Sequence, residues 1–438
     1  MAESDTVSRR RFLQTGALAG AAAVAAPYVI QSSLKAATGA NDRIGLAGIG
    51  VGRRGGSVIN AFQHFDDAEV VAVADVDEDR AKKVASWVDG DAYTDYRRVL
   101  ERDDVDAIVT ATPDHWRALV CIHAAQAGKD IYGEKPMTLT VSEGRKMVEA
   151  VRKYDIVFQT GSQQRSNPTN RRGCELIRNG RIGKVKKVIA HNYPSPWICG
   201  LQGQAIPDRI DWEKWCGPAE VVPYHKDLET PRANPGWLSF RQFAGGEMTG
   251  WGAHGFDQVQ WALDMDESGP VEIWTEGEPF DPPVYNKPES RDRGNKMCSQ
   301  PKVYMRYPGD IVMELGDGPR GGATFIGEKG TITIGRGSLK SDPKELAEEP
   351  LKDKDVSLYK SDNHGKNWLT CIKERKRPVA DVETGHRSAT VCHLGNIARW
   401  VGRRLEWDPE AEEFVGDSEA NYMLDRPRRK PYQLPDKV

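Results

Sequence analysis

A buried strand runs directly into a glycine-rich turn near the start of the chain. Residues 43–49 are almost entirely apolar, which is typical of a strand in a parallel sheet. The turn at residues 48–55 contains four glycines, and residues 57–65 then have the apolar spacing of a helix. Strand, glycine turn and helix in this order predict a Rossmann fold, in which a dinucleotide pyrophosphate sits on the N-terminus of the helix.

The glycines fit the pattern G-x-G-x-x-G in two registers. The literal match places Gly50, Gly52 and Gly55 at the three positions, whereas the phase of the strand favours Gly48 and Gly50 as the first two. In that second register Arg53 replaces the third glycine. The candidate cofactor-binding residues in the turn are therefore Gly48, Ile49, Gly50, Gly52 and Arg53.

The residues after the turn indicate which dinucleotide binds. A second apolar strand, residues 69–75, ends at Asp75, where a ribose-hydroxyl acceptor is expected. Since an acid repels a 2′-phosphate, NAD is favoured over NADP, although Arg80 nearby keeps NADP open. Further alternation of strands (105–113, 130–132) with a helix (116–127) predicts a doubly wound parallel sheet with its site at the strands' carboxyl ends.

Two later turns carry the sequences Thr112-Pro113-Asp114-His115-Trp116 and Gly133-Glu134-Lys135-Pro136. With the glycine turn and Asp75, they resemble the Gfo/Idh/MocA family of oxidoreductases, and the Glu-Lys-Pro tripeptide is its most specific mark. The resemblance continues through residues 245–257 and 325–332, so it covers essentially the whole chain after the first 40 residues. It adds Thr112, Pro113, His115, Glu134 and Lys135 to the candidate cofactor-binding residues.

The family resemblance implies an α/β fold with two parts: an N-terminal Rossmann sheet and a C-terminal α/β domain on a large, mostly antiparallel sheet. Short strands with turn residues between them independently support the second sheet: residues 185–193, 271–276, 301–307, 311–315 and 331–334. Long loops are predicted at 194–245 and 336–365, and helices at 367–375 and 385–401. We place the domains at 40–160 and 161–438, and the C-terminal helices are candidates to pack back on the first domain.

Hydride transfer from a carbinol needs a base for the hydroxyl proton. Lys135 is the first candidate, because it follows a Rossmann strand on the cofactor side, and the family's matching lysine lies against the substrate hydroxyl. His254 is the second, since members of the family use the matching histidine to bind or deprotonate substrate. Asp257, one helical turn later, either orients His254 or caps the helix. Many members carry Asp four residues before this histidine, but here the residue is Gly250.

Four further side chains are weaker candidates for the cleft. Gln163 and Arg165 follow a predicted strand at 156–160; Gln163 is assigned to the cofactor, and Arg165 to a substrate hydroxyl or carboxylate. Tyr193 and Trp251 are candidates for a sugar platform, with core packing as the alternative. No His, Cys, Asp or Glu spacing in the sequence suggests a metal site.

The N-terminus resembles an export signal. Ser8-Arg9-Arg10-Arg11-Phe12-Leu13-Gln14 precedes an Ala/Gly-rich run at residues 15–30, as in signals of the twin-arginine (Tat) pathway. This run is too short and too interrupted for a membrane span, so residues 1–37 are interpreted as signal peptide and linker, with no stable membrane span after cleavage. The mature protein is then periplasmic or secreted, exported folded, which suits an enzyme that loads its NAD beforehand and holds it tightly.

Charge argues against nucleic acid as a partner. The net charge is −3, and the one basic run, residues 426–430, is interpreted as a solvated C-terminal tail. The expected partner is a small carbohydrate. The family resemblance also favours a homo-oligomer, because sheet-to-sheet association is common among its members.

The sequence is compatible with three functions. The first is an exported NAD(P)-dependent sugar oxidoreductase in which Lys135 and His254 handle the hydroxyl proton. The second is an NAD-dependent glycosidase, an activity known in the family, which works by transient ring oxidation and elimination with no net redox change. The third, suggested by Gly250, is a non-catalytic cofactor-binding protein.

Overall fold

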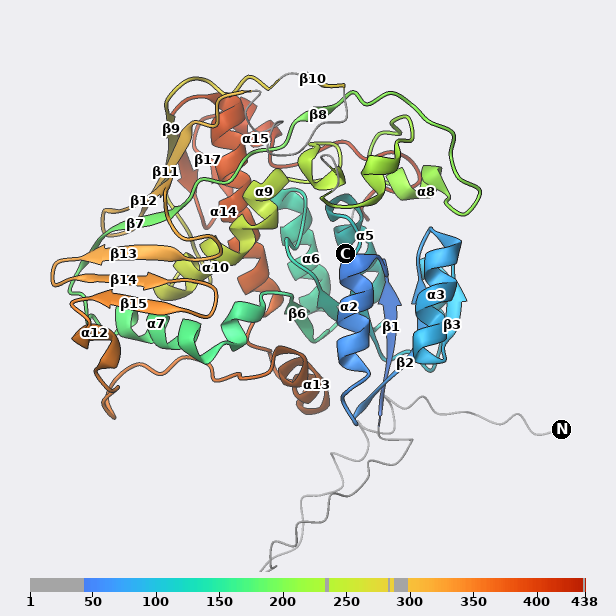
Figure 1. Cartoon of the computed structure of the whole chain (residues 1–438), viewed down its shortest axis with the longest axis horizontal. Helices are drawn as coiled ribbons and strands as arrows, with labels where there is room; N and C mark the ends of the chain where they lie inside the picture. The colour runs from blue at the N-terminus through green and yellow to red at the C-terminus, as the bar shows by residue number, and fades with distance from the viewer. Residues whose placement is uncertain (1–42, 233–235, 283, 287–297, 436–437) are drawn as a thin grey trace, which may run out of the picture.

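The computed structural model describes residues 43–232, 236–282, 284–286, 298–435 and 438. The predicted signal peptide and linker at residues 1–37 lie outside these residues. Among the described helices, none is long and apolar enough to cross a membrane. Figure 1 shows two sheets side by side, the first in blue and teal and the second mainly in green, yellow and orange.

The first sheet is a six-stranded, all-parallel Rossmann sheet in the order β3-β2-β1-β4-β5-β6. Its strands are β1 (Ile44–Ile49), β2 (Ala68–Ala74), β3 (Asp91–Tyr93), β4 (Ala107–Thr110), β5 (Asp130–Gly133) and β6 (Phe158–Thr160). The connecting helices are α2 (Arg53–Phe62), α3 (Glu78–Val88), α4 (Tyr96–Leu100), α5 (Asp114–Gln126) and α6 (Val141–Lys153). Because all six strands are parallel, their carboxyl ends form one edge.

The second sheet has nine strands in the order β15-β14-β13-β7-β12-β11-β9-β16-β17. Only the β7–β12 pair is parallel, and every other pair is antiparallel. Its strands are β7 (Val185–His191), β9 (Glu272–Glu276), β11 (Lys302–Tyr307), β12 (Ile311–Gly316), β13 (Ala323–Gly327), β14 (Thr331–Ile334), β15 (Leu339–Asp342), β16 (Leu405–Asp408) and β17 (Glu413–Phe414). The predicted fold class is therefore confirmed.

Long helices cover the inner face of the second sheet and join it to the first domain. They are α7 (Pro168–Arg178), α10 (Gly252–Ala262) and α14 (Val382–Val401), with α9 (Gly246–Gly250) and α13 (His364–Glu374) alongside. The 20-residue α14 packs on α10 and also on α6 of the Rossmann domain. Trp368 of α13 packs edge-on against Phe62 of α2, 5.4 Å between ring centroids. The C-terminal helices thus share their core with the Rossmann domain.

The predicted loop at 194–245 contains several short elements: β8 (Ile198–Cys199), which pairs with β10 (Val284–Tyr285), α8 (Trp212–Cys216), and the 3₁₀ turns η3 (Lys226–Glu229) and η4 (Trp237–Ser239). The remaining short elements are η2 (Gln163–Ser166), α12 (Glu345–Glu348) and α15 (Ser418–Tyr422). Buried aromatic side chains stabilise the 194–245 segment; for example, Trp212 and Trp215 stack with centroids 4.5 Å apart.

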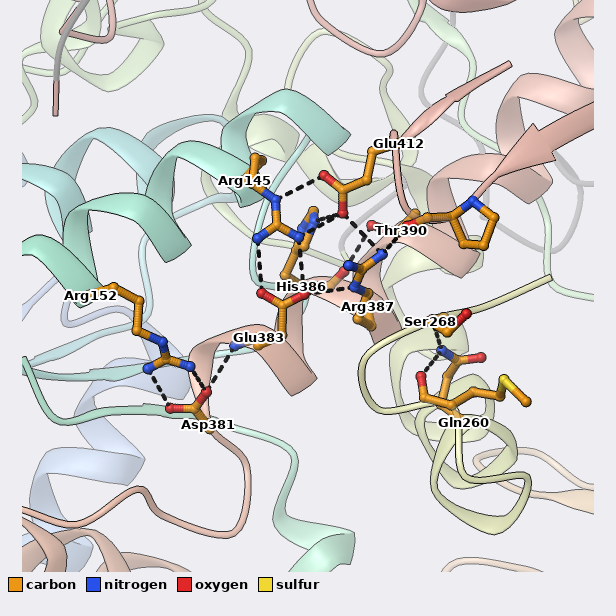
Figure 2. A network of polar contacts seen from close by, with 12 residues as sticks. Arg145, Arg152, Gln260, Ser268, Asp381, Glu383, His386, Arg387, Thr390 and Glu412 are labelled. Carbon is orange, nitrogen blue, oxygen red and sulfur yellow. Dashed lines mark hydrogen bonds and ion pairs between the residues drawn. The ribbon is translucent and has the colours of Figure 1, made fainter. Parts of the chain in front are cut away.

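Ion pairs also connect the two domains (Figure 2). Arg145 of α6 donates to Glu383 of α14 at 2.9 Å and to Glu412, between β16 and β17, at 2.8 Å. The buried His386 of α14 places Nε2 2.6 Å from the same Glu412 carboxylate. One carboxylate therefore ties α6 and α14 to the edge of the second sheet.

The prediction of a solvated C-terminal tail was wrong. The side chain of Arg428 is only 8% exposed and pairs with Glu143 of α6 at 3.0 Å. Arg426 donates to the carbonyl oxygen of Gln242 at 2.9 Å, and Arg429 to that of Gly217 at 3.1 Å. These acceptors come from distant parts of the chain, so a local charge run gave no sign of them.

Candidate active site

The glycine turn has the geometry of the literal G-x-G-x-x-G register. Gly50 has a φ of +74°, a conformation that favours glycine, and its N–H donates to Ala74 at 2.8 Å. Gly52 precedes α2, and a Cβ there would meet nothing within 4 Å, so backbone N–H groups at the start of α2 are open to a ligand. Gly55 lies directly against the carbonyl oxygen of Gly50, whereas Gly48 lies within β1. The alternative register, with Arg53 as the third position, does not hold.

A cavity of about 690 Å³ extends from this turn along the carboxyl edge of the Rossmann sheet. Seven of the predicted cofactor-binding residues line it: Ile49, Gly50, Gly52, Arg53, Asp75, Thr112 and Pro113. A dinucleotide fits three features of this cavity: the open N-terminus of α2, the acidic residue after β2 and the size of the cavity. NAD is therefore the ligand that these residues fit.

Asp75 is set up to accept hydroxyl groups. Its Oδ1 accepts from the Asp77 N–H at 3.0 Å and from Arg80 Nη1 at 3.1 Å, and burial raises its pKa against the charge of Arg80. Arg80 also pairs with Asp77 at 3.3 Å. Because both acids occupy the Arg80 guanidinium, it is poorly placed to bind a 2′-phosphate, in keeping with NAD.

Segments from outside the Rossmann sheet roof the cavity, and the sequence did not predict them. The Asp211 N–H donates to the carbonyl oxygen of Val76 at 3.1 Å, and the Glu78 N–H donates to that of Arg209 at 2.9 Å. These two hydrogen bonds hold the chain before α8 beside the end of β2. Tyr432 of the C-terminal segment packs edge-on against Trp116, with centroids 5.2 Å apart. Other lining residues without a sequence signal are Arg54, Ser57, Thr94, Asp95, Tyr96, Arg97, Lys214, Trp215, Glu229, Thr230, Pro231 and Arg232.

His115, predicted to bind the cofactor, supports this roof instead. Its Nε2 lies 2.9 Å from the Trp215 carbonyl oxygen, and its ring packs between Trp215 and Phe243. The side chain is buried, and burial lowers its pKa to about 3. His115 is not among the residues that line the cavity.

Glu134, Lys135 and Gln163 come together at the end of β5. Glu134 accepts hydrogen bonds from Arg54 Nε at 2.8 Å and from Gln163 Nε2 at 2.9 Å. The ammonium group of Lys135 donates to the Gly250 carbonyl oxygen at 3.1 Å. Burial lowers the pKa of Lys135, and the opposing effect of the Glu134 charge is smaller. A larger fraction of the amine is therefore unprotonated near neutral pH.

His254 lies on α10 close to Lys135. It is 6% exposed, its Nδ1 is buried without a hydrogen-bond partner among the described residues, and its ring is 5.8 Å from that of Trp251. Burial, with the charges of Lys135 and Arg336, lowers its pKa well below the usual value. The imidazole is therefore neutral at pH 7 and able to accept a proton.

Two charged side chains fill the place of the missing aspartate. A Cβ on Gly250 would lie 3.1 Å from Glu247 Oε2 and 3.2 Å from Arg232 Nη2. Arg232 Nε and Nη2 donate to the Glu247 carboxylate at 2.8 and 2.9 Å. Glu247 therefore places an acid beside Gly250, the residue whose carbonyl oxygen binds Lys135, but this acid is already bound by a guanidinium group.

Asp257 and Arg165 bind each other rather than the site. Arg165 Nε donates to Asp257 at 2.8 Å, Ser388 donates to the same carboxylate at 2.7 Å, and Asp266 completes the network. Both Arg165 and Asp257 are 1% exposed. Asp257 consequently does not orient His254, and Arg165 does not reach a substrate, because each satisfies the other's buried charge.

Tyr193 and Gln164 hold the loop that faces His254. The Tyr193 hydroxyl accepts from the Gly321 N–H at 2.7 Å, and Gln164 Nε2 donates to the Gly321 carbonyl oxygen at 2.7 Å. Tyr193 is buried and acts as a support, whereas Trp251 is half-buried beside His254. Gln164 also has a buried Oε1 without a partner among the described residues.

No group of three or more His, Cys, Asp or Glu side chains with the arrangement of a metal site occurs within the described ranges.

Two family models match the chain. Residues 43–162 match "Oxidoreductase family, NAD-binding Rossmann fold", and residues 183–434 match "Oxidoreductase family, C-terminal alpha/beta domain", both of the Gfo/Idh/MocA type. The two matches together span most of the described residues.

Several curated proteins are similar over part of the chain. A myo-inositol 2-dehydrogenase of Thermotoga maritima is 32% identical over 156 residues, which is 35% of this chain and 46% of the relative. A 2,7-anhydro-N-acetylneuraminate hydratase of Mediterraneibacter gnavus is 29% identical over 39% of this chain and 43% of the relative. A glycosyl hydrolase family 109 protein of Shewanella pealeana is 29% identical over 33% and 36%. The chain thus spans less than half the length of these relatives.

Solved structures match over a larger share. The aldose-aldose oxidoreductase of Caulobacter crescentus, complexed with glycerol, has a TM-score of 0.58 at 18% identity and covers 83% of this chain and 99% of that one. The WlbA dehydrogenase of Bordetella pertussis, in complex with NADH and UDP-GlcNAcA, has a TM-score of 0.57 at 17% identity, over 84% and 99%. At these identities the likeness shows a shared fold.

Proposed function

Because the chain belongs to the Gfo/Idh/MocA oxidoreductase family, we propose that it is an NAD-dependent oxidoreductase acting on a sugar or sugar derivative. NAD, when bound, supplies the hydride acceptor. The protein's part is to hold the carbinol, exclude water and take the hydroxyl proton. Lys135 and His254 carry that last role.

The observation that carries this proposal is the proximity of two nitrogen bases whose pKa values are both lowered. Lys135 reaches the backbone of Gly250, four residues before His254, and the lysine charge acts on that imidazole. Burial is the first cause of the lowered pKa in each case. A base with a pKa near the working pH transfers protons most effectively, so the lowered pKa suits Lys135 to remove the hydroxyl proton. The neutral imidazole of His254 is available to bind the same hydroxyl group by a hydrogen bond.

We further propose that the enzyme is exported with NAD bound tightly. The roof over the cavity, formed by the α8 segment and Tyr432, supports slow release of the cofactor. Residues 8–14 support transport of the folded protein by the Tat pathway into the periplasm or medium. An exported enzyme that cannot exchange NAD would run a closed cycle, oxidising one sugar and reducing another.

A second candidate is cleavage of a glycosidic bond through transient oxidation of the ring. The hydratase and the family 109 glycosyl hydrolase among the relatives favour it, since neither reaction changes the net redox state. Two neighbouring bases also suit it, because one would serve the hydroxyl group and the other the acidified C–H. Net redox change separates the two candidates.

The test begins with small molecules released from purified, denatured protein, measured by mass spectrometry. Stoichiometric NAD(H) supports tight binding, and an empty site argues against the closed cycle. Sugars and aryl glycosides are then added to the protein with NAD. Net NADH formation, or oxidation of one sugar coupled to reduction of another, supports the oxidoreductase. Aglycone release without net NADH supports the glycosidase, and no turnover of either class counts against both.

Localisation needs its own experiment. Replacing Arg9 and Arg10 with lysine should leave the protein in the cytoplasm of the expressing cells, whereas the unchanged chain should be found in the periplasm or medium. Export that is unaffected by the double replacement would contradict the Tat proposal.

A further inference from the structure

Several positively charged side chains act on His254, and not all of them form ion pairs. The cations that act on this imidazole are those of Lys135, Arg336, Arg54 and Arg232. Arg54 pairs with Glu134 and Arg232 with Glu247, each through a short ion pair. Lys135 and Arg336 remain, and no carboxylate within the described residues forms an ion pair with either of them.

Arg336 packs against an aromatic ring beside His254. Its guanidinium group lies 5.6 Å from the centre of the Trp251 ring, which in turn lies 5.8 Å from the His254 ring. Arg336 is exposed, and its side chain makes no hydrogen bond or ion pair to another described residue. The donor groups are therefore available to a ligand that approaches His254 along the face of Trp251.

A second arginine, Arg320, lies in the neighbouring loop. The strands β13 and β14 pair Ala323 with Ile334, so residues 317–322 and 335–338 leave the same end of this hairpin. Arg320, in the first loop, is exposed, and its charge acts on buried or half-buried His191 and Tyr193. As with Arg336, no ion pair to a described residue involves its side chain.

Two buried polar atoms near these arginines also lack a hydrogen-bond partner among the described residues. Gln164 is 5% exposed and His254 is 6% exposed, and each has a side-chain atom without a hydrogen bond among the described residues. A Cβ on Gly321 would lie 3.4 Å from Gln164 Oε1, 3.6 Å from the Trp251 ring and 3.7 Å from His254 Cβ. Gly321 thus brings the unpaired atoms, the ring and the arginine loops to one place.

We propose that the substrate is an anionic sugar whose charged group binds Arg336 and Arg320 while its reacting hydroxyl faces Lys135 and His254. A carboxylate is the best match, because a guanidinium group binds it through two parallel hydrogen bonds. This inference rests on the proposed function and deepens it by naming the substrate class. Sugar acids, such as uronates and aldonates, are the expected substrates, and a phosphate or sulfate ester shares the same charge.

The experiment measures binding and turnover separately, with purified protein loaded with NAD. Isothermal calorimetry compares matched probes: D-glucuronate with D-glucuronamide, D-galacturonate with D-galactose, and D-gluconate with D-glucitol. Glucose 6-phosphate and glucose 6-sulfate distinguish the other anions from carboxylates. NADH absorbance and product analysis record turnover of the same probes.

At least one sugar acid should bind 10 to 100 times more tightly than its neutral counterpart, the gain expected of a charge-assisted hydrogen bond. Arg336→Gln and Arg320→Gln should remove most of that preference, and Arg336→Lys should keep part of it. Lys340→Gln, an exposed lysine on β15, is the matched control and should change nothing.

Preference for a phosphate or sulfate ester over every sugar acid would support the anion site but show that its ligand is not a carboxylate. Neutral probes that bind or react as well as the anionic ones would overturn the inference and leave the oxidoreductase proposal standing. Tight binding of sugar acids with no turnover of any probe would support the anion site and count against the proposed function.

Discussion

The ammonium group of Lys135 donates a hydrogen bond to the carbonyl oxygen of Gly250, 3.1 Å away on the other domain. The acceptor is a backbone atom, so it is present whatever side chain residue 250 carries. The lysine is therefore positioned by the second domain even though residue 250 is not the aspartate that the family resemblance implies. The space for that aspartate is filled by Arg232 and Glu247.

Removing the amine of Lys135 should slow catalysis strongly but leave cofactor binding intact. We expect Lys135→Ala to lower kcat by about 100- to 10,000-fold, the usual contribution of general acid–base catalysis, with little change in NAD affinity. His254→Ala should also lower kcat by orders of magnitude. Steady-state rates and NAD titrations measure the two effects, with Lys340→Ala as control. Full activity in both variants would show that neither side chain takes the hydroxyl proton.

Introducing the missing acid should not improve the enzyme. In Gly250→Asp the new Cβ would crowd Leu238, Glu247 and Arg232 at 3.0 to 3.2 Å, so we expect a loss of about 1–3 kcal/mol in the free energy of unfolding. A new carboxylate would also raise the pKa of Lys135, and since the unprotonated amine is the base, the pH–rate profile should move toward alkaline pH by about one unit. Gly250→Ala separates the two effects: it should destabilise without shifting the profile.

Asp75 should determine the choice of dinucleotide. Asp75→Asn removes the charge that repels a 2′-phosphate and one of the two ion pairs of Arg80, so NAD should bind roughly 10- to 100-fold more weakly while the ratio of NADP to NAD affinity rises. Fluorescence titration with both dinucleotides measures this, and Asp79→Asn, exposed on α3, is the control. An unchanged preference would show that Asp75 does not contact the ribose.

The C-terminal segment should help to retain the cofactor. Tyr432 lines the cavity and packs on Trp116, so Tyr432→Ala should weaken NAD binding by roughly 10-fold and speed its release, as expected for loss of one buried aromatic contact. Tyr422→Ala removes a tyrosine that is 75% exposed and should have no effect. Equal rates of NAD release in the two variants would show that Tyr432 does not help to retain the cofactor.

The link between the domains should weaken in acid. Burial alone would raise the pKa of Glu412, but hydrogen bonds from Arg145 and His386 outweigh it and hold this pKa well below the usual range. A lowered folded pKa stabilises the protein above the unfolded pKa of about 4.3, and this contribution is lost as the pH falls further. Glu412→Gln should therefore lower the free energy of unfolding by about 1–2 kcal/mol at pH 7 and flatten its decline below pH 4.5.

Urea unfolding at several pH values tests this, and Glu406→Gln, an exposed neighbour on β16, is the control. If Glu412→Gln and Glu406→Gln lose stability equally, the contacts of Glu412 with Arg145 and His386 contribute nothing measurable.

Local patterns in the sequence determined the Rossmann domain. Apolar strands, a glycine turn and an acid after β2 occur within about one βαβ unit, so their meaning does not depend on distant residues. Lys135 and His254 were named from short motifs through the family resemblance, and the structure brings them close together. Strand Val185–His191 and the hairpin of β13 and β14 were likewise predicted from alternation and turn residues.

Partner choice among polar side chains was decided only by the tertiary structure. Arg165 and Asp257 are 92 residues apart, and Lys135 and Gly250 are 115 apart, so no local spacing reveals either contact. The basic run at 426–430 was misinterpreted for the same reason, since its acceptors lie on α6 and around α8. A charged side chain looks alike in sequence whether it faces water, a buried acid or a ligand. Its role follows from which elements the packing of the core brings beside it.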